Sequence, residues 1–215
     1  MSTDGATQGG QPRRAYRSPR RLQQAAENRQ AVLDAATRLF DERGYVATAM
    51  RDVAAESGLS LETVYANFRS KSELLMAAID VAVVGDDEPV PLHDRPEFQA
   101  LGRGSREQRA RACARLVTGI HGRTSGLILA LKQGAAADPA LEDVLRDRET
   151  SRRADVELGA RLVAGRDVAE EECDGLWALY DVSVYQLLTE LRGWTATQYE
   201  RWLADATDRL LHERG

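Results

Sequence analysis

Apolar residues recur at helical spacing along most of this chain, and no stretch alternates apolar and polar residues as a strand does. The most informative stretch is 48–68, where two short helical patterns meet at Gly58. Glycine takes the left-handed conformation that ends a helix at little cost, and Ser60 can cap the following helix. Two helices joined by so short a turn are typical of a helix-turn-helix, whose second helix lies in the major groove of DNA.

Further helices are predicted on both sides of this motif. A helix from about residue 21 to 43 carries one apolar face, and Gly44 ends it. Ser70 and Glu73 form a capping box that starts another helix, which continues to about Gly85. The first part of the chain is therefore predicted to be a small helical domain.

The rest of the chain is predicted to be a helical body. Residues 85–96 hold three prolines and a run of acidic residues, which is typical of a loop. Capping boxes and the pair Asp138-Pro139 mark several helix starts after it. The predicted helices span about 96–102, 105–122, a stretch through 127–131, 139–164, 167–193 and 196–215. The fold class predicted from this pattern is all-α.

Composition supports a globular protein with its acidity in the body. The 215 residues are 43% apolar, and no run is long enough to span a membrane or to resemble a signal peptide, so a cytoplasmic protein is expected. Residues 1–80 carry 11 Lys and Arg against 10 Asp and Glu, a net charge of +1. Residues 81–215 carry 18 against 24, a net charge of −6, so the overall charge of −5 does not argue against DNA binding by the first part.

No enzyme chemistry is predicted. The sequence has no glycine-rich phosphate loop, no nucleophile elbow and no cluster of histidine and carboxylates at a credible spacing. The three histidines lack metal-ligand spacing, so neither a metal nor a cofactor is expected. Cys113 and Cys173 are expected to be reduced and packed, with a redox switch as the alternative.

Residues 1–21 are predicted to be disordered, because they contain few apolar side chains. This segment contains five arginines and a single acidic residue: Arg13, Arg14, Arg17, Arg20, Arg21 and Asp4. One interpretation is a solubilising tail, and the other is a basic arm that neutralises DNA phosphates. The arm is favoured because this segment leads directly into the predicted helix-turn-helix domain.

The chain resembles the TetR family of bacterial regulators over about residues 25–80. The matching positions are Arg29, Val32, Leu33, Ala36, Leu39, Phe40, Gly44-Tyr45, Thr48, Met50–Ala54, Gly58, Ser60, Thr63–Tyr65, Phe68, Ser70-Lys71 and Leu74-Leu75. The resemblance implies a disordered basic arm at 1–21 and a three-helix DNA-binding domain at 22–70. It also implies a helical ligand-binding and dimerisation domain at 71–215, entered through the helix that begins after Ser70.

By position, the resemblance assigns DNA contacts to Thr48, Ser60, Leu61, Glu62, Thr63, Tyr65, Asn67 and Lys71. The hydroxyl groups of Thr63 and Tyr65 can reach phosphates or base edges. Asn67 can pair with adenine, Glu62 can accept from cytosine, and Leu61 offers only an apolar contact.

Three positions depart from the family pattern. A small polar or basic residue is common at position 61 and His or Tyr at 67, so base specificity cannot be copied from a relative. Ala49 stands where a capping Ser or Thr is frequent, so Thr48 is expected to supply the cap or the phosphate contact. Lys71 is expected to meet a phosphate together with the free N–H groups of its helix.

The function implied is that of a repressor, a homodimer that binds a pseudo-palindromic double-stranded operator and leaves it when a small apolar ligand binds. The alternative is a ligand-independent DNA-binding or architectural protein. Dimerisation is expected through the last two helices, whose apolar faces could instead pack only into their own body. Membrane partners are not expected.

The ligand site is expected to be lined by Phe98, His121, Leu127, Leu131, Trp177 and Tyr180. For each of these residues, ordinary core packing is the competing interpretation, because apolar stripes at helical spacing usually form a core. His121 is a polar ring in an apolar helix and needs a hydrogen-bond partner, which is either a ligand or a backbone carbonyl.

Overall fold

A computed structural model describes residues 19–136 and 138–212, and within those ranges every regular element is helical. The all-α prediction is therefore confirmed. The elements are α1 (Pro19–Ala47), α2 (Met50–Ser57), α3 (Leu61–Asn67), α4 (Lys71–Val84), η1 (Leu92–Asp94), α5 (Pro96–Gln99), η2 (Ala100–Gly102), α6 (Arg106–Ala135), α7 (Pro139–Ala164), α8 (Glu170–Leu179), α9 (Val182–Gln186), η3 (Leu187–Leu191) and α10 (Ala196–His212).

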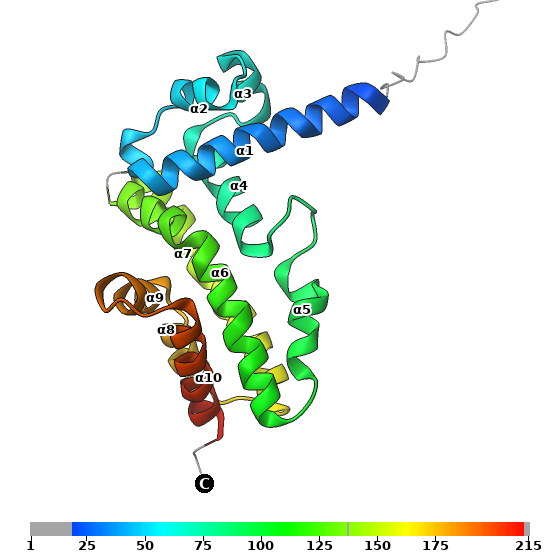
Figure 1. The fold of residues 1–215 in the computed structure, drawn as a ribbon, viewed down its shortest axis with the longest axis vertical. Coiled ribbons are helices and arrows are strands. Elements are labelled where there is room, and N and C mark those ends of the chain that lie inside the picture. Colours follow the sequence, from blue (N-terminus) through cyan, green and yellow to red (C-terminus); the bar gives the residue numbers. More distant parts are fainter. Residues whose placement is uncertain (1–18, 137, 213–215) are drawn as a thin grey trace, which may run out of the picture.

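The head of the molecule consists of α1, α2 and α3, with α4 leading down from it into the body (Figure 1). Helix α1 begins at Pro19 and so includes Arg20 and Arg21, which the sequence assigned to the basic arm. Gly44 interrupts α1 with φ 73°, a left-handed conformation, so the helix turns where the sequence predicted its end. The rest of the predicted arm, residues 1–18, lies outside the described residues.

The body is organised around α6, which runs diagonally through the molecule beside α7 and α10 (Figure 1). The sequence predicted that Gly122 ends a helix, but α6 continues without a break for 30 residues. That prediction is wrong because α6 packs against α1 and α4 near one end and against α10 along the other. Packing on both sides of a glycine outweighs its low helix propensity of about 1 kcal/mol.

The predicted helix from 167 to 193 is also wrong, because it breaks at Tyr180 and Asp181. The carboxylate of Asp181 accepts a hydrogen bond from the Ser183 N–H at 2.8 Å and thereby caps a new helix, α9. That helix passes into η3, a single π turn. The start of this helix also differs from the prediction. Ala169 is the cap residue of α8, and its N–H donates to the Glu172 carboxylate at 2.8 Å.

One apolar core joins the head to the body. It contains Val32, Leu33 and Phe40 of α1 together with Leu127 and Leu131 of α6, all of them almost completely buried. The two layers approach closely at Gly134, where an added Cβ would lie 2.8 Å from side-chain carbons of both Tyr45 and Leu141. The head therefore sits on α6 through direct core packing.

Two other expectations can be compared with the described residues. None of the helices there is both long and apolar enough to cross a lipid bilayer. Cys113 and Cys173 are unpaired and buried, and burial raises the pKa of the Cys113 thiol to about 11. Neither thiol is therefore ionised near neutral pH, which gives no support to a redox switch.

The close approach at Gly134 gives a testable prediction. Gly134→Ala should lower the free energy of unfolding by about 1–2 kcal/mol, because the new methyl group overpacks the layer between Tyr45 and Leu141. Gly119→Ala, in the same helix, is the matched control: its Cβ would meet only the flexible end of Arg123 at 3.4 Å. This control should be stabilised by roughly 0.5–1 kcal/mol. Urea unfolding followed by circular dichroism measures both, and an equal response of the two variants would contradict the account.

Candidate functional site

Helix α3 is fixed to the head by both of its ends. At its start, the Ser60 hydroxyl accepts a hydrogen bond from the Thr63 N–H at 3.2 Å. Within and just after the helix, Val64 and Phe68 are buried in the head core. The guanidinium of Arg29 lies 4.6 Å from the centre of the Phe68 ring and covers it. The orientation of α3 is therefore set by the head and not by a partner.

The turn before α3 has the geometry that the sequence predicted. Gly58 takes φ 71° and ψ 17°, and the Leu59 N–H donates to the Ala54 carbonyl at 3.2 Å. This arrangement closes α2 and redirects the chain within a few residues. Helices α2 and α3 thus form the predicted helix-turn-helix.

The outward face of α3 is exposed although it carries apolar groups. Leu61 is 38% exposed and Tyr65 is 48% exposed, and both lie on a helix whose other side is buried. Between them, Glu62 is a carboxylate whose pKa is lowered by hydrogen bonds from its own backbone N–H and from Ser60. A rigid, outward helix with a leucine, a tyrosine and an ionised carboxylate suits recognition of a partner surface.

The hydroxyl and amide groups of α3 have local partners. The Thr63 hydroxyl lies 3.1 Å from that of Ser60, and the Asn67 amide donates to the Thr63 carbonyl at 2.8 Å. These contacts order both side chains along the helix. The bond to Thr63 uses one N–H of the Asn67 amide, and contact with adenine would use its other N–H and its oxygen.

Thr48 does not occupy the position that the sequence predicted. Its side chain is 1% exposed, and its hydroxyl donates to the carbonyls of Gly44 at 2.8 Å and Leu39 at 3.2 Å. The prediction that Thr48 caps α2 or contacts a phosphate is wrong for this side chain. The Asp52 carboxylate instead accepts from the Ala49 N–H at 2.9 Å, so a residue inside α2 performs the capping.

Lys71 also has a different role from the predicted phosphate contact. Its ammonium donates to the carbonyls of Tyr45 at 2.7 Å and Thr48 at 2.9 Å, and it lies 4.0 Å from the centre of the Tyr45 ring. Desolvation of this partly buried ammonium lowers its pKa. Lys71 therefore ties the start of α4 to the end of α1.

A cavity of about 830 Å³ lies in the body between α4, the loop after it, α6, α7 and the start of α9. Its volume is in the range of sites for small organic ligands, roughly 300–1,000 Å³. Phe98, His121 and Tyr180, three of the six residues expected at a ligand site, line it. Leu127 and Leu131 do not, because they belong to the core under α1. Trp177 is outside the lining too, since its ring packs on the guanidinium of Arg152 at 4.8 Å.

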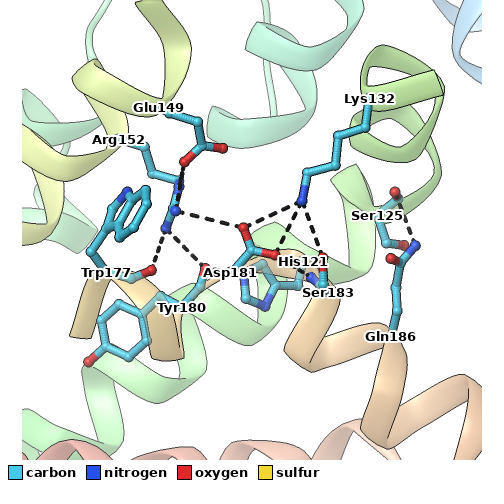
Figure 2. Close-up of polar contacts among 10 residues, drawn as sticks. All are labelled: His121, Ser125, Lys132, Glu149, Arg152, Trp177, Tyr180, Asp181, Ser183 and Gln186. Atoms are coloured by element: carbon cyan, nitrogen blue, oxygen red, sulfur yellow. Dashed lines mark hydrogen bonds and ion pairs between the residues drawn. The ribbon is translucent and has the colours of Figure 1, made fainter. Parts of the chain in front are cut away.

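Four charged groups meet at the break between α8 and α9, and three of them, Glu149, Arg152 and Asp181, line the cavity (Figure 2). Arg152 lies 2.7 Å from Glu149 and 3.8 Å from Asp181, and Lys132 approaches Asp181 to 3.3 Å from the other side. Arg152 also donates to the Trp177 carbonyl at 2.8 Å, at the end of α8. Two cations and two carboxylates thus balance one another and hold the break between α8 and α9.

His121 lies beside this network, and its partners are protein groups. Its Nε2 is 3.1 Å from the Tyr180 carbonyl, and its Nδ1 is 3.2 Å from the Tyr199 hydroxyl. A carbonyl only accepts, so Nε2 carries the proton and Nδ1 accepts from Tyr199. Burial lowers the pKa of His121 to about 4, so the ring is neutral near pH 7. The sequence left a ligand and a carbonyl as alternatives, and the structure supplies the carbonyl.

Two contacts that hold α4 were missed from the sequence, one of them at the cavity. Asp80 lines the cavity and lies 3.0 Å from Arg148 of α7. Arg123 of α6 donates to the carbonyls of Ala82 at 2.7 Å and Val83 at 3.0 Å, at the end of α4. The sequence did contain a signal for Asp80, because it is the only charged residue in the otherwise apolar stretch 74–84. The partner arginines lie 40 to 68 residues away in sequence, where no local pattern can identify them.

Comparisons with known proteins agree with this geometry. Residues 32–78 match the family model described as bacterial regulatory proteins, tetR family. The repressor Rv3405c of Mycobacterium tuberculosis is 46% identical over 50 residues, which cover 23% of this chain and 27% of that protein. The regulator AcrR of Shigella flexneri is 38% identical over 52 residues, 24% of each chain. The chain thus matches about a quarter of the length of these curated relatives.

Two solved structures extend the likeness to the whole fold. MexZ, a repressor of Pseudomonas aeruginosa, superimposes with a TM-score of 0.57 at 23% identity, covering 87% of this chain and 96% of that one. A TetR-family protein of Mesorhizobium loti gives a TM-score of 0.62 at 18% identity, covering 87% and 96%. At such identities these likenesses show the fold alone, and the family's description as regulatory proteins agrees with the expectation of a non-enzyme.

The buried histidine predicts a pH dependence of stability. Since the unfolded chain has a His pKa near 6.5 and the folded pKa is about 4, the unfolded state binds the extra proton between these values. Stability should therefore fall as the pH is lowered, by about 2 kcal/mol from His121 alone between about pH 7 and pH 5. Urea unfolding of the wild type and of His121→Gln at both pH values measures this difference. A wild-type slope no steeper than that of the variant would refute the assignment.

Proposed function

We propose that this chain, which belongs to the TetR family of bacterial regulatory proteins, is a transcriptional repressor that binds operator DNA through α3. The observation that carries the proposal is the exposed face of α3, held by a head that needs no partner to orient it. Leu61, Tyr65 and the partly exposed Thr63 form this face. The hydroxyl groups would contact phosphates or base edges, and Leu61 a thymine methyl group. Footprinting of genomic fragments tests this binding.

A dimer would place two such helices on inverted half-sites of a pseudo-palindromic operator. Such a complex in a promoter would block RNA polymerase, which makes repression the expected outcome. The basic segment before α1 would add phosphate contacts that are independent of sequence. Lys71 would support DNA binding indirectly, by fixing α4 to the end of α1.

The expected dimer surface needs revision in the light of the packing. Tyr199, Leu203 and Leu211 of α10 are buried within their own protomer, so the main apolar stripe of this helix is used internally. In contrast, Leu187 is 53% exposed and Leu191 is 75% exposed, both in η3 after the break at Asp181. We assign the dimer contact to η3 and to the outward sides of α8 and α10 beside it.

A ligand in the body cavity would release the operator through α4. Residues of α4 such as Met76 and Val81 form one wall of the cavity, while the start of the same helix is tied to the head by Lys71. A ligand that prefers a different position of α4 would change the separation of the two recognition helices in the dimer. It can shift the equilibrium only by the difference in its affinity for the two states. The cavity favours this proposal over the ligand-independent DNA-binding or architectural alternative.

Substitutions on the recognition face test the DNA contacts. Tyr65→Ala and Thr63→Ala should each weaken operator binding by about 1–3 kcal/mol if the side chain contacts DNA directly. Thr150→Ala, an exposed threonine on α7 in the body, is the matched control and should bind as the wild type does. Fluorescence anisotropy with a footprinted operator measures all three. Wild-type affinity in both head variants would contradict the assignment of α3.

The dimer surface is tested separately from DNA binding. Replacing Leu187 and Leu191 together by Glu should give monomers, because two charges would be buried in the proposed interface. Leu158→Glu introduces a charge at another exposed leucine, on α7, and should leave the dimer intact. Multi-angle light scattering gives the mass of each variant. A dimeric double variant would show that the contact lies elsewhere.

A further inference from the structure

The body cavity is apolar inside and acidic around its mouth. Eight carboxylate side chains line it against three arginines. The two least exposed of the ion-paired carboxylates that line it, Glu149 at 29% and Asp181 at 26%, are balanced by Arg152 and Lys132. The excess of negative charge therefore lies nearer to solvent, on α4, on the loop after it and on the outer part of α7.

Two of the outer carboxylates form no ion pair in the described part of the chain, although Arg95, which is bound to Asp86, attracts one of them, Glu88, at longer range. Asp147 of α7 and Glu88 of the loop line the cavity but form no ion pair within the ranges 19–136 and 138–212. The remaining outer acids are engaged, for example Asp87 with Arg29 at 2.9 Å. The mouth consequently attracts positive charge and repels anions.

The most informative of these groups is the pair formed by Asp80 and Arg148. Asp80 belongs to α4 and Arg148 to α7, and their side chains meet at 3.0 Å while both line the cavity. The Arg148 side chain is 19% exposed, whereas that of Asp80 is 67% exposed. The carboxylate that holds α4 to α7 can thus be reached by an incoming cation.

We propose that the cavity takes a lipophilic cation, whose positive charge is received by the outer carboxylates and competes with Arg148 for Asp80. This inference rests on the proposed function and names the ligand class for it. The apolar groups of the ligand would fill the interior, lined by side chains such as Leu116, Val117 and Ile120 of α6.

An anion fits this cavity less well. The three lining arginines each already contact a carboxylate: Arg29 with Asp87, Arg148 with Asp80 and Arg152 with Glu149. An anionic ligand would have to separate one of these pairs while passing the unpaired carboxylates of the mouth. A cation meets carboxylate oxygens that can still accept an interaction. Its entry therefore breaks fewer favourable contacts within the protein.

The same contact links binding to the position of α4. When the cation takes Asp80, α4 loses its ion pair with Arg148 of α7. It stays attached to α6 by the hydrogen bonds from Arg123 and by the apolar core that the two helices share. The ligand thereby prefers a state in which α4 has moved from α7, which is the difference in affinity that release of the operator requires.

The experiment uses two probes of equal shape and opposite charge, tetraphenylphosphonium and tetraphenylborate, with the full-length protein free of DNA. Isothermal titration calorimetry should show that tetraphenylphosphonium binds at least about tenfold more tightly than tetraphenylborate. Equal or tighter binding of tetraphenylborate overturns the proposal. So does a lack of tetraphenylphosphonium binding by protein that still binds its operator, and this outcome leaves the repressor proposal standing. Tetraphenylphosphonium binding by protein that does not bind an operator would support the ligand class and contradict the repressor proposal.

Variants then test the competition for Asp80. Asp80→Asn should weaken binding of tetraphenylphosphonium by about two- to fivefold, and Arg148→Gln should strengthen it by a similar factor. Arg146→Gln removes the same charge from an exposed position of α7 that does not line the cavity, where it pairs with Glu142 and Asp143. This control should bind as the wild type does. Binding weakened by Arg148→Gln, or strengthened equally by Arg146→Gln, would refute the competition, and circular dichroism checks that each variant is folded.

Discussion

The packing of α1 on α6 is the contact on which the rest of the structure depends. Buried side chains of α1 share one apolar core with Leu127 and Leu131 of α6, and Gly134 lets the two layers approach closely. Burial of one such leucine contributes on the order of 1.5–3 kcal/mol. The head is consequently built onto the longest helix of the body, and both α3 and the cavity take their positions from that helix.

Helix α4 connects the cavity to the head on this frame. Lys71 at its start is tied to the head, Arg123 of α6 holds its last turn, and Asp80 between them contacts Arg148 of α7. Buried apolar side chains of α4, such as Leu75 and Ile79, also pack in the core that contains α1 and α6. The polar ties, in contrast, are partly exposed. Partly exposed ion pairs contribute about 1 kcal/mol or less each, so a ligand of ordinary affinity can exchange one of them.

Local sequence signals predicted most of the fold, because they depend on neighbouring residues. Gly58 and the caps Ser60, Ser70 and Ser105 act within a few positions, and the structure places each of them at a helix end. The errors arose where a distant contact decides the outcome. Gly122 remains helical because α6 is packed along its length, and the break at Asp181 depends on Arg152 and Lys132 from other helices.

The candidate site shows the same difference between residues with a local sequence signal and residues whose partners are set by the fold. The outward residues of α3 follow from helical periodicity, so Leu61 and Tyr65 could be identified from the sequence. Thr48 and Lys71 could not, since their partners are carbonyl groups brought together by the turn after Gly44. Leu127 was assigned to the cavity because an apolar stripe does not reveal which neighbour covers it.

The proposed coupling of the cavity to α3 through α4 can be measured by reciprocal binding. The affinity of tetraphenylphosphonium is measured by calorimetry for the free protein and for the protein saturated with its operator. We expect the operator-bound protein to bind the cation more weakly, by the same factor by which the cation weakens operator binding. Equal cation affinity in the two states would contradict the coupling.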